Sequence, residues 1–96
     1  MSNSLSVVSI TKNEEKFIRD AVQSAKFANE VLILDSNSSD KTCEIALKMG
    51  ARVEQHDWLG FGKQKNLAVK LAVNDWVFVL DSDERITEEL QIEILS

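Results

Sequence analysis

Proline is absent from this chain of 96 residues, and glycine occurs only three times. Flexible linkers and low-complexity segments are usually rich in these residues, so the composition indicates no boundary between domains. The single cysteine, Cys43, excludes an internal disulfide and favours a cytoplasmic protein. The longest apolar runs, at 31–34 and 76–80, are far too short to cross a bilayer as a helix.

Positive charge is also scarce, with 11 Lys and Arg against 16 Asp and Glu, which gives a net charge of −5. No dense block of basic residues occurs, and this argues against nucleic acid as a partner. Hydrophobic residues make up 44% of the chain and charged residues 28%, which is typical of a globular protein. The length predicts one small domain or a piece of a larger one.

Apolar runs typical of strands alternate along the chain with segments of helical spacing. Asn13 is expected to cap the first helix, and the strand at 76–80 is expected to be buried on both faces. The apolar residues Trp58, Leu59 and Phe61 are expected to pack beneath the helix that follows them. Strands are predicted at 5–10, 31–34, 51–55 and 76–80, and helices from 14, after the polar turn 36–40, at 63–73 and from 87.

The order of these elements, in which each strand is followed by a helix, predicts an α/β fold. We expect a Rossmann-like parallel sheet of about four strands, with helices on both faces and right-handed crossovers. By analogy with doubly wound sheets, the expected strand order is 3-2-1-4.

The predicted strand at 76–80 ends in three carboxylates, those of Asp81, Asp83 and Glu84. Asp81 and Asp83 are two residues apart, so in an extended segment they point to the same side, roughly 7 Å apart. Such carboxylates repel one another unless a cation lies between them, which predicts a divalent metal site. The alternative is structural, because acidic residues also favour the N-terminus of a helix such as the one expected from Thr87.

Polar residues follow two other predicted strands in the same way. In a parallel sheet the carboxyl ends of the strands lie at one edge, where ligands usually bind. Three such strand ends favour a binding site over ordinary loop chemistry. The candidate residues at these ends are Ile10, Thr11 and Asn13, then Asp35 and Ser36, and then Asp81 and Asp83.

Four short segments occur in an order that is more specific than any one of them alone. They are Thr-Lys-Asn-Glu-Glu at 11–15, Leu-Asp-Ser-Asn-Ser-Ser-Asp-Lys-Thr at 34–42, Gly-Phe-Gly-Lys-Gln-Lys-Asn-Leu-Ala at 60–68 and Leu-Asp-Ser-Asp-Glu-Arg at 80–85. Together they resemble the nucleotide-sugar-binding half of family 2 glycosyltransferases, which have the GT-A fold. The resemblance covers Leu5 to about Leu90. The last segment is most similar to bacterial enzymes that add glucose or heptose to the inner core of lipopolysaccharide.

The resemblance implies roles for the residues at the first two strand ends. Ile10 and Thr11, with Asn13 behind them, would line the nucleoside pocket. Asp35 and Ser36 would hold the base and the ribose. Many relatives have a second acid in place of Ser36, which weakens the argument for uracil at this position but not the argument for a nucleotide.

The remaining roles implied by the resemblance concern the diphosphate. Lys65 takes the place of an arginine that is common in relatives, a cation near the base or the diphosphate. Asp83 would bind a Mg²⁺ or Mn²⁺ ion, and Asp81 would hold the ribose or the water shell of the metal. The donor would be a nucleotide-diphosphate sugar, with a UDP-sugar expected first. The acceptor would be a saccharide or a lipid-linked molecule such as the lipopolysaccharide core.

The resemblance also implies an inverting transferase whose catalytic base lies well beyond the acidic motif. Residues 1–96 are therefore expected to be the donor-binding portion, without the acceptor half, and to bind donor only. We expect a cytoplasmic protein at the inner face of the bacterial inner membrane, with peripheral membrane association of the full enzyme. We also expect self-association through the apolar edge strand at 76–80.

Three alternatives compete with this interpretation. A receiver-like signalling module also gathers acids at strand ends, but it needs an acidic pair after the first strand, where this chain has Thr11, Lys12 and Asn13. An ATPase needs the loop G-x-x-x-x-G-K-[ST], which the sequence lacks. A non-catalytic, nucleotide-binding remnant of the same fold shares every motif, so the sequence leaves this alternative open.

Overall fold

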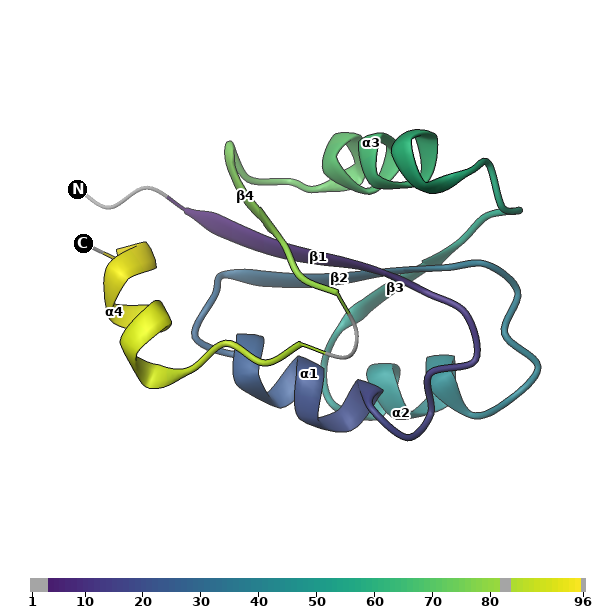
Figure 1. The fold of residues 1–96 in the computed structure, drawn as a ribbon, viewed down its shortest axis with the longest axis horizontal. Coiled ribbons are helices and arrows are strands. Elements are labelled where there is room, and N and C mark those ends of the chain that lie inside the picture. The colour runs from purple at the N-terminus through teal and green to yellow at the C-terminus, as the bar shows by residue number, and fades with distance from the viewer. Residues whose placement is uncertain (1–3, 82–83, 96) are drawn as a thin grey trace.

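A parallel sheet lies between two layers of helices in the structure, a computed structural model that describes residues 4–81 and 84–95 (Figure 1). The strands are β1 (Leu5–Thr11), β2 (Glu30–Asp35), β3 (Arg52–Gln55) and β4 (Trp76–Val79). The helices are α1 (Ile18–Ala25), α2 (Thr42–Lys48), α3 (Phe61–Leu71) and α4 (Glu88–Leu95). The strand order is β3-β2-β1-β4, and each neighbouring pair is parallel. The predicted fold class and strand order are both confirmed.

The two faces of the sheet are covered by different helices. Helix α3 lies over one face, and α1, α2 and α4 lie on the other (Figure 1). Side chains of β1 alternate between these faces, as the pleat of a strand requires. Val8 packs in a cluster with Ala68 of α3, whereas Val7 packs in a cluster with Ala25 of α1.

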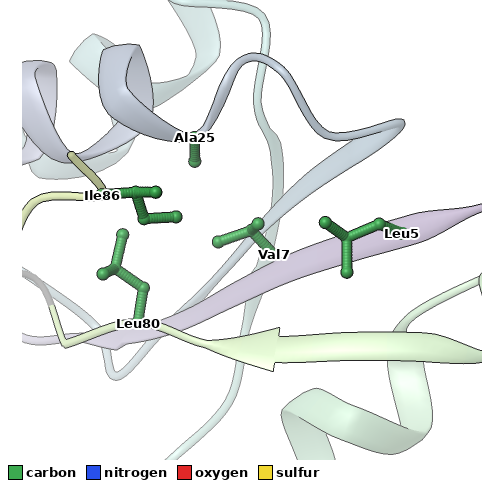
Figure 2. Packing of buried hydrophobic residues seen from close by; sticks show 5 residues of the cluster. All are labelled: Leu5, Val7, Ala25, Leu80 and Ile86. Atoms are coloured by element: carbon green, nitrogen blue, oxygen red, sulfur yellow. The ribbon is translucent and has the colours of Figure 1, made fainter. Parts of the chain in front are cut away.

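The segment after β4 returns to the face that carries α1. Leu80 and Ile86 are buried there with Leu5, Val7 and Ala25, and Figure 2 shows these five side chains gathered between the strands and α1. The backbone N–H of Ile86 donates to the Ser24 hydroxyl at 3.1 Å. This packing determines where the chain leaves the carboxyl end of β4.

The first helix begins later than predicted. Asn13 adopts a left-handed backbone with φ of 53°, and its side chain accepts a hydrogen bond from Ser39 N–H at 2.8 Å. It therefore caps no helix, and α1 begins at Ile18. Gly50 follows α2 with φ of 92°, a left-handed conformation that glycine adopts readily. The start of the last helix is confirmed, because Thr87 accepts a hydrogen bond from Leu90 N–H just before α4. None of the helices in the described ranges is both long and apolar enough to cross a membrane.

The prediction that 76–80 is buried on both faces was wrong. Strand β4 is an edge of the described sheet and pairs only with β1. Trp76, at the start of the strand, is 59% exposed, and Val79 is exposed as well. Apolar residues in a strand indicate burial only when neighbouring layers exist to cover them, and at this edge Trp76 and Val79 face solvent.

Candidate functional site

Asp35 is the centre of a hydrogen-bond network at the carboxyl ends of β1 and β2. Its side chain is 0% exposed. The carboxylate accepts hydrogen bonds from the Thr11 hydroxyl at 2.7 Å, from the Ser38 hydroxyl at 2.6 Å and from Ser38 N–H at 2.7 Å. The register of the sheet makes this possible, because Thr11 lies directly opposite Asp35 on the neighbouring strand.

The pKa of Asp35 reflects a balance between burial and these donors. Burial acts to raise the pKa, but the hydrogen bonds from Ser38 and Thr11 outweigh it and hold the pKa below its ordinary value. Asp35 is therefore a buried anion at neutral pH. In this structure the carboxylate holds the turn after β2 against β1, and its predicted contact with a base or ribose stays a prediction.

The loops that follow β1 and β2 are also hydrogen-bonded to each other next to this network. Asn13 N–H donates to the Ser38 hydroxyl at 2.7 Å, and the Lys12 ammonium donates to the Asn37 carbonyl at 2.8 Å. Asn37, like Asn13, has a left-handed backbone, with φ of 57°. Asparagine tolerates this conformation better than most residues, so the two asparagines suit the tight loops in which they lie.

A cleft of about 520 Å³ opens beside these loops, and it is lined by Lys12, Ser36, Asn37 and Trp58. The buried side chain of Gln64, which is 0% exposed, forms part of its support. The Gln64 amide donates to the Ser36 hydroxyl at 3.0 Å, and its carbonyl oxygen accepts from Leu59 N–H at 3.0 Å. Gln64 thus ties the loop before α3 to the end of β2.

Gln64 is a site residue for which the sequence predicts no role. Gln64 precedes the buried Ala68 by one helical turn, so helical spacing places both on the buried face of α3. A polar side chain on such a face must find hydrogen-bond partners. That pattern was the available signal, although it does not identify the partners.

The prediction that the apolar residues around the start of α3 pack beneath this helix was wrong. They are Trp58 and Leu59 in the preceding loop and Phe61, the first residue of α3, and all three are exposed. Trp58 is 50% exposed and Phe61 is 71% exposed. The two rings contact each other edge to face, with their centroids 4.9 Å apart and an angle of 90° between their planes. The loop is also tied to the end of β2, because the Asn37 amide donates to the Asp57 carboxylate at 2.6 Å. Trp58 therefore lies at the cleft, and neither aromatic side chain lies in the core.

The end of β4 is more open than the ends of β1 and β2. Asp81 is exposed, and its carboxylate lies 3.9 Å from the Lys65 ammonium on α3. The backbone N–H of Asp81 donates to the Glu84 carboxylate at 3.1 Å. Asp83, the predicted metal ligand, lies outside the described residues.

A divalent cation would find only part of its ligand set in the described ranges. No group of three His, Cys, Asp or Glu side chains there is arranged to hold a metal. Asp81 supplies an exposed carboxylate oxygen, the type of donor that Mg²⁺ and Mn²⁺ prefer. Its neighbour Lys65 is a cation that would compete for that oxygen. The carboxylate of Asp81 fits a metal ligand, and the predicted metal contact of Asp83 stays a prediction.

The structure brings the predicted residues together in two groups. Thr11, Asn13, Asp35 and Ser36 belong to the bonded ends of β1 and β2, with Ile10 half-buried beside them. Lys65 and Asp81 form the second group at the end of β4. Because β1 pairs with both β2 and β4, the two groups share one edge of the sheet.

Comparison with known proteins identifies the family. Residues 6–95 match the family described as glycosyl transferase family 2. The chain belongs to this family. An uncharacterized glycosyltransferase of Rickettsia conorii is 44% identical to this family 2 chain over 95 residues, which are 98% of the chain and 34% of the relative. The lipopolysaccharide core biosynthesis glycosyltransferase LpsC of Rhizobium meliloti is 30% identical over 92 residues, which are 91% of the chain and 34% of LpsC.

Solved structures agree with this assignment. S. aureus TarS 1-349 superimposes with a TM-score of 0.82 at 30% identity, covering 95% of this family 2 chain and 31% of that chain. Glucosyl-3-phosphoglycerate synthase from Mycobacterium tuberculosis in complex with UDP gives a TM-score of 0.79 at 27% identity, covering 95% and 38%. These neighbours are GT-A glycosyltransferases, so the predicted family and fold are confirmed. The chain spans about a third of the length of the relatives and neighbours that it matches.

Proposed function

We propose that this chain is the donor-binding portion of a glycosyltransferase, and that it holds a nucleotide-diphosphate sugar along the carboxyl edge of its sheet. The observation that carries the proposal is the arrangement of that edge. A cleft beside rigidly bonded loops lies at the ends of β1 and β2, and an exposed cation and carboxylate lie at the end of β4. The first group suits a nucleoside, and the second suits a diphosphate with its counter-ion.

A UDP-sugar is the donor that we propose first. The structure of the M. tuberculosis synthase at TM-score 0.79 is a complex with UDP, which supports this choice. Lys65 would contact a phosphate oxygen as a point charge, because an ammonium lacks the two-pronged geometry of a guanidinium. Ile10, Thr11 and Ser36 would shape the nucleoside pocket, while Asp35 and Asn13 keep its loops in position.

A divalent metal is part of the proposal. A further structure of the M. tuberculosis synthase, with a TM-score of 0.74 and 28% identity over 83% of this chain and 33% of that one, holds Mn²⁺ and UDP. In this chain Asp83 would bind Mg²⁺ or Mn²⁺, and Asp81 would hold the ribose or the water shell of the metal. When bound, such an ion neutralises the negative charge that grows on a departing diphosphate.

The acceptor and the transfer reaction belong to a protein of the relatives' full length. We propose a saccharide or lipopolysaccharide-core acceptor, which the name of LpsC supports at 30% identity. We propose further that the full-length protein inverts the sugar with a base from the acceptor half. We also propose that it is cytoplasmic, at the inner membrane, and associates peripherally with that membrane.

Calorimetry on the 96-residue chain tests the donor site directly. UDP, ADP and GDP are titrated with and without Mn²⁺ into the wild type, Asp83→Ala and the control Asp75→Asn, which changes an exposed acid before β4. We expect UDP to bind only with metal, and Asp83→Ala alone to abolish binding. At 100 times its dissociation constant, the nucleotide should also add about 2.7 kcal/mol of stability. A folded wild-type chain that binds none of the nucleotides would contradict the proposal.

A further inference from the structure

Trp58 lies outside all four segments that carry the family resemblance, yet its ring forms a wall of the cleft at the end of β2. Half of the side chain is exposed. We propose that the indole ring of Trp58 is the surface on which the nucleobase of the donor stacks, an inference that rests on the proposed nucleotide site. The base would lie between this ring and the loops after β1 and β2.

The ring is held in position before any ligand arrives. The edge-to-face contact with Phe61 supports it on one side, and the bond from Leu59 N–H to Gln64 anchors the next residue. The preceding residue, Asp57, accepts a hydrogen bond from Asn37. A rigid aromatic platform loses little conformational entropy when a ligand stacks on it, so an exposed ring held in this way is suited to binding.

The other walls of the cleft supply groups for the edge of a base. Ser36 contributes a hydroxyl, Asn37 a side-chain amide and Lys12 an ammonium that already donates to the Asn37 carbonyl. One flat apolar wall facing a few polar groups is the arrangement that a nucleobase needs, because its faces are aromatic and its edge is polar. A phosphate group has no aromatic face that could stack on the indole ring.

The position of the cleft agrees with the length of a nucleoside diphosphate. Neighbouring strands are about 4.8 Å apart, so the ends of β2 and β4, with β1 between them, are separated by about 10 Å. A nucleoside diphosphate in an extended conformation spans this distance. With its base at Trp58, its phosphates would reach Lys65 and Asp81.

The chain contains only two tryptophans, Trp58 and Trp76, and this makes the inference testable by fluorescence. In Trp76→Phe, Trp58 is the single tryptophan, and in the matched control Trp58→Phe the single tryptophan is Trp76. UDP with Mg²⁺, which does not quench fluorescence as paramagnetic Mn²⁺ does, is titrated into both. We expect emission to change in Trp76→Phe and to stay constant in Trp58→Phe. Inorganic pyrophosphate, which lacks a base, should change neither.

Affinity provides the second measurement. Trp58→Ala should weaken UDP binding by about tenfold or more, and Trp58→Phe should retain most of it, because phenylalanine still offers an aromatic face. Pyrophosphate affinity should change less than about twofold in either variant, since no stacking is lost. Should Trp58→Ala fail to fold, the fluorescence of Trp76→Phe decides the question.

The results separate this inference from the proposed function. UDP that binds the wild type and Trp58→Ala equally well, or that leaves Trp58 emission unchanged, overturns the role of Trp58 and leaves the donor site intact. A folded wild type that binds no UDP overturns both proposals.

Discussion

Two carboxylates at the same edge of the sheet differ sharply in how they are held. Asp35, at the end of β2, is buried and accepts three hydrogen bonds of 2.6–2.7 Å from Thr11 and Ser38. Asp81, at the end of β4, is exposed, and its carboxylate has Lys65 as a distant cation at 3.9 Å. We call Thr11, Asp35 and Ser38 the braced end, and the pair Lys65 and Asp81 the open end.

This difference shows how the carboxyl edge of one sheet can offer different environments to two parts of a ligand. At the braced end, satisfied hydrogen bonds keep the loops in one geometry, so a nucleoside would meet a surface that needs little rearrangement. At the open end the charges remain in contact with water, so they stay available to a diphosphate and a metal ion. The position of β4 at the edge of the described sheet adds to this openness.

Removing each carboxylate in turn is the strongest test of the comparison. Asp35→Ala should lower the free energy of unfolding by about 3 kcal/mol, because it leaves the donors of buried Thr11 and half-buried Ser38 without their charged acceptor. Asp81→Ala should change it by less than about 0.5 kcal/mol, since the exposed pair contributes little. Urea denaturation of both variants measures the two values. Equal losses of stability would remove the distinction between the ends.

Acid should weaken the braced end selectively. The hydrogen bonds from Ser38 and Thr11 keep the pKa of Asp35 in the folded chain below its unfolded value, which is about 3.9. Between these two pKa values the unfolded chain binds more protons, so stability rises with pH in that interval. The contribution is fully present above about pH 4 and is lost as the pH falls through the folded pKa.

Thermal melts from pH 7 down to pH 2 should therefore show a smaller acid-induced loss in Asp35→Asn than in the wild type. Glu30 and Asp40 also have lowered pKa values, so part of the loss should remain in the variant. Asp81→Asn serves as the control, and its profile should follow the wild type. A parallel profile for Asp35→Asn would show that the buried carboxylate does not carry this dependence.

Much of the fold was predictable because it depends on local patterns and on rules of connection. Alternating apolar runs and helical spacing identify β-α units, and parallel connection then places all carboxyl strand ends at one edge. Thr11 and Asp35 could be placed near each other for this reason. The exposure of Trp76 was not predictable in the same way, because the burial of a residue on β4 depends on whether a further layer covers this strand.

The details of the site depended on contacts between distant residues. Asn13 is suited both to a helix cap and to a left-handed turn, and its bond to Ser39, 26 residues away, favours the turn. The apolar side chain of Trp58 is typical of a core residue. The hydrogen bonds of Asp57 and Gln64 nevertheless hold its loop at the cleft. Local sequence cannot distinguish these outcomes, since each depends on a partner brought close by the fold.

Strand β4, which leads to the open end, should also be where chains associate. Trp76 and Val79 are exposed along β4, which pairs only with β1 in the described sheet. An exposed apolar edge strand offers unpaired backbone groups to a second copy. Sedimentation velocity should detect reversible self-association of the wild type, and Val79→Lys should weaken it about tenfold or more, because charges on edge strands oppose pairing. A wild type that stays monomeric at high concentration would contradict this prediction.

The smallest effect is expected from refining the cation at the open end. Lys65→Arg should leave the free energy of unfolding within about 0.5 kcal/mol of the wild type, because the 3.9 Å pair with Asp81 is exposed. It should tighten UDP binding only a few-fold, since a guanidinium can hold two phosphate oxygens where an ammonium holds one. Lys63→Arg, an exposed change two residues earlier on α3, should alter neither quantity. If calorimetry shows the same gain for both variants, the gain does not depend on the position of the guanidinium, and the open end has no specific place for the diphosphate at Lys65.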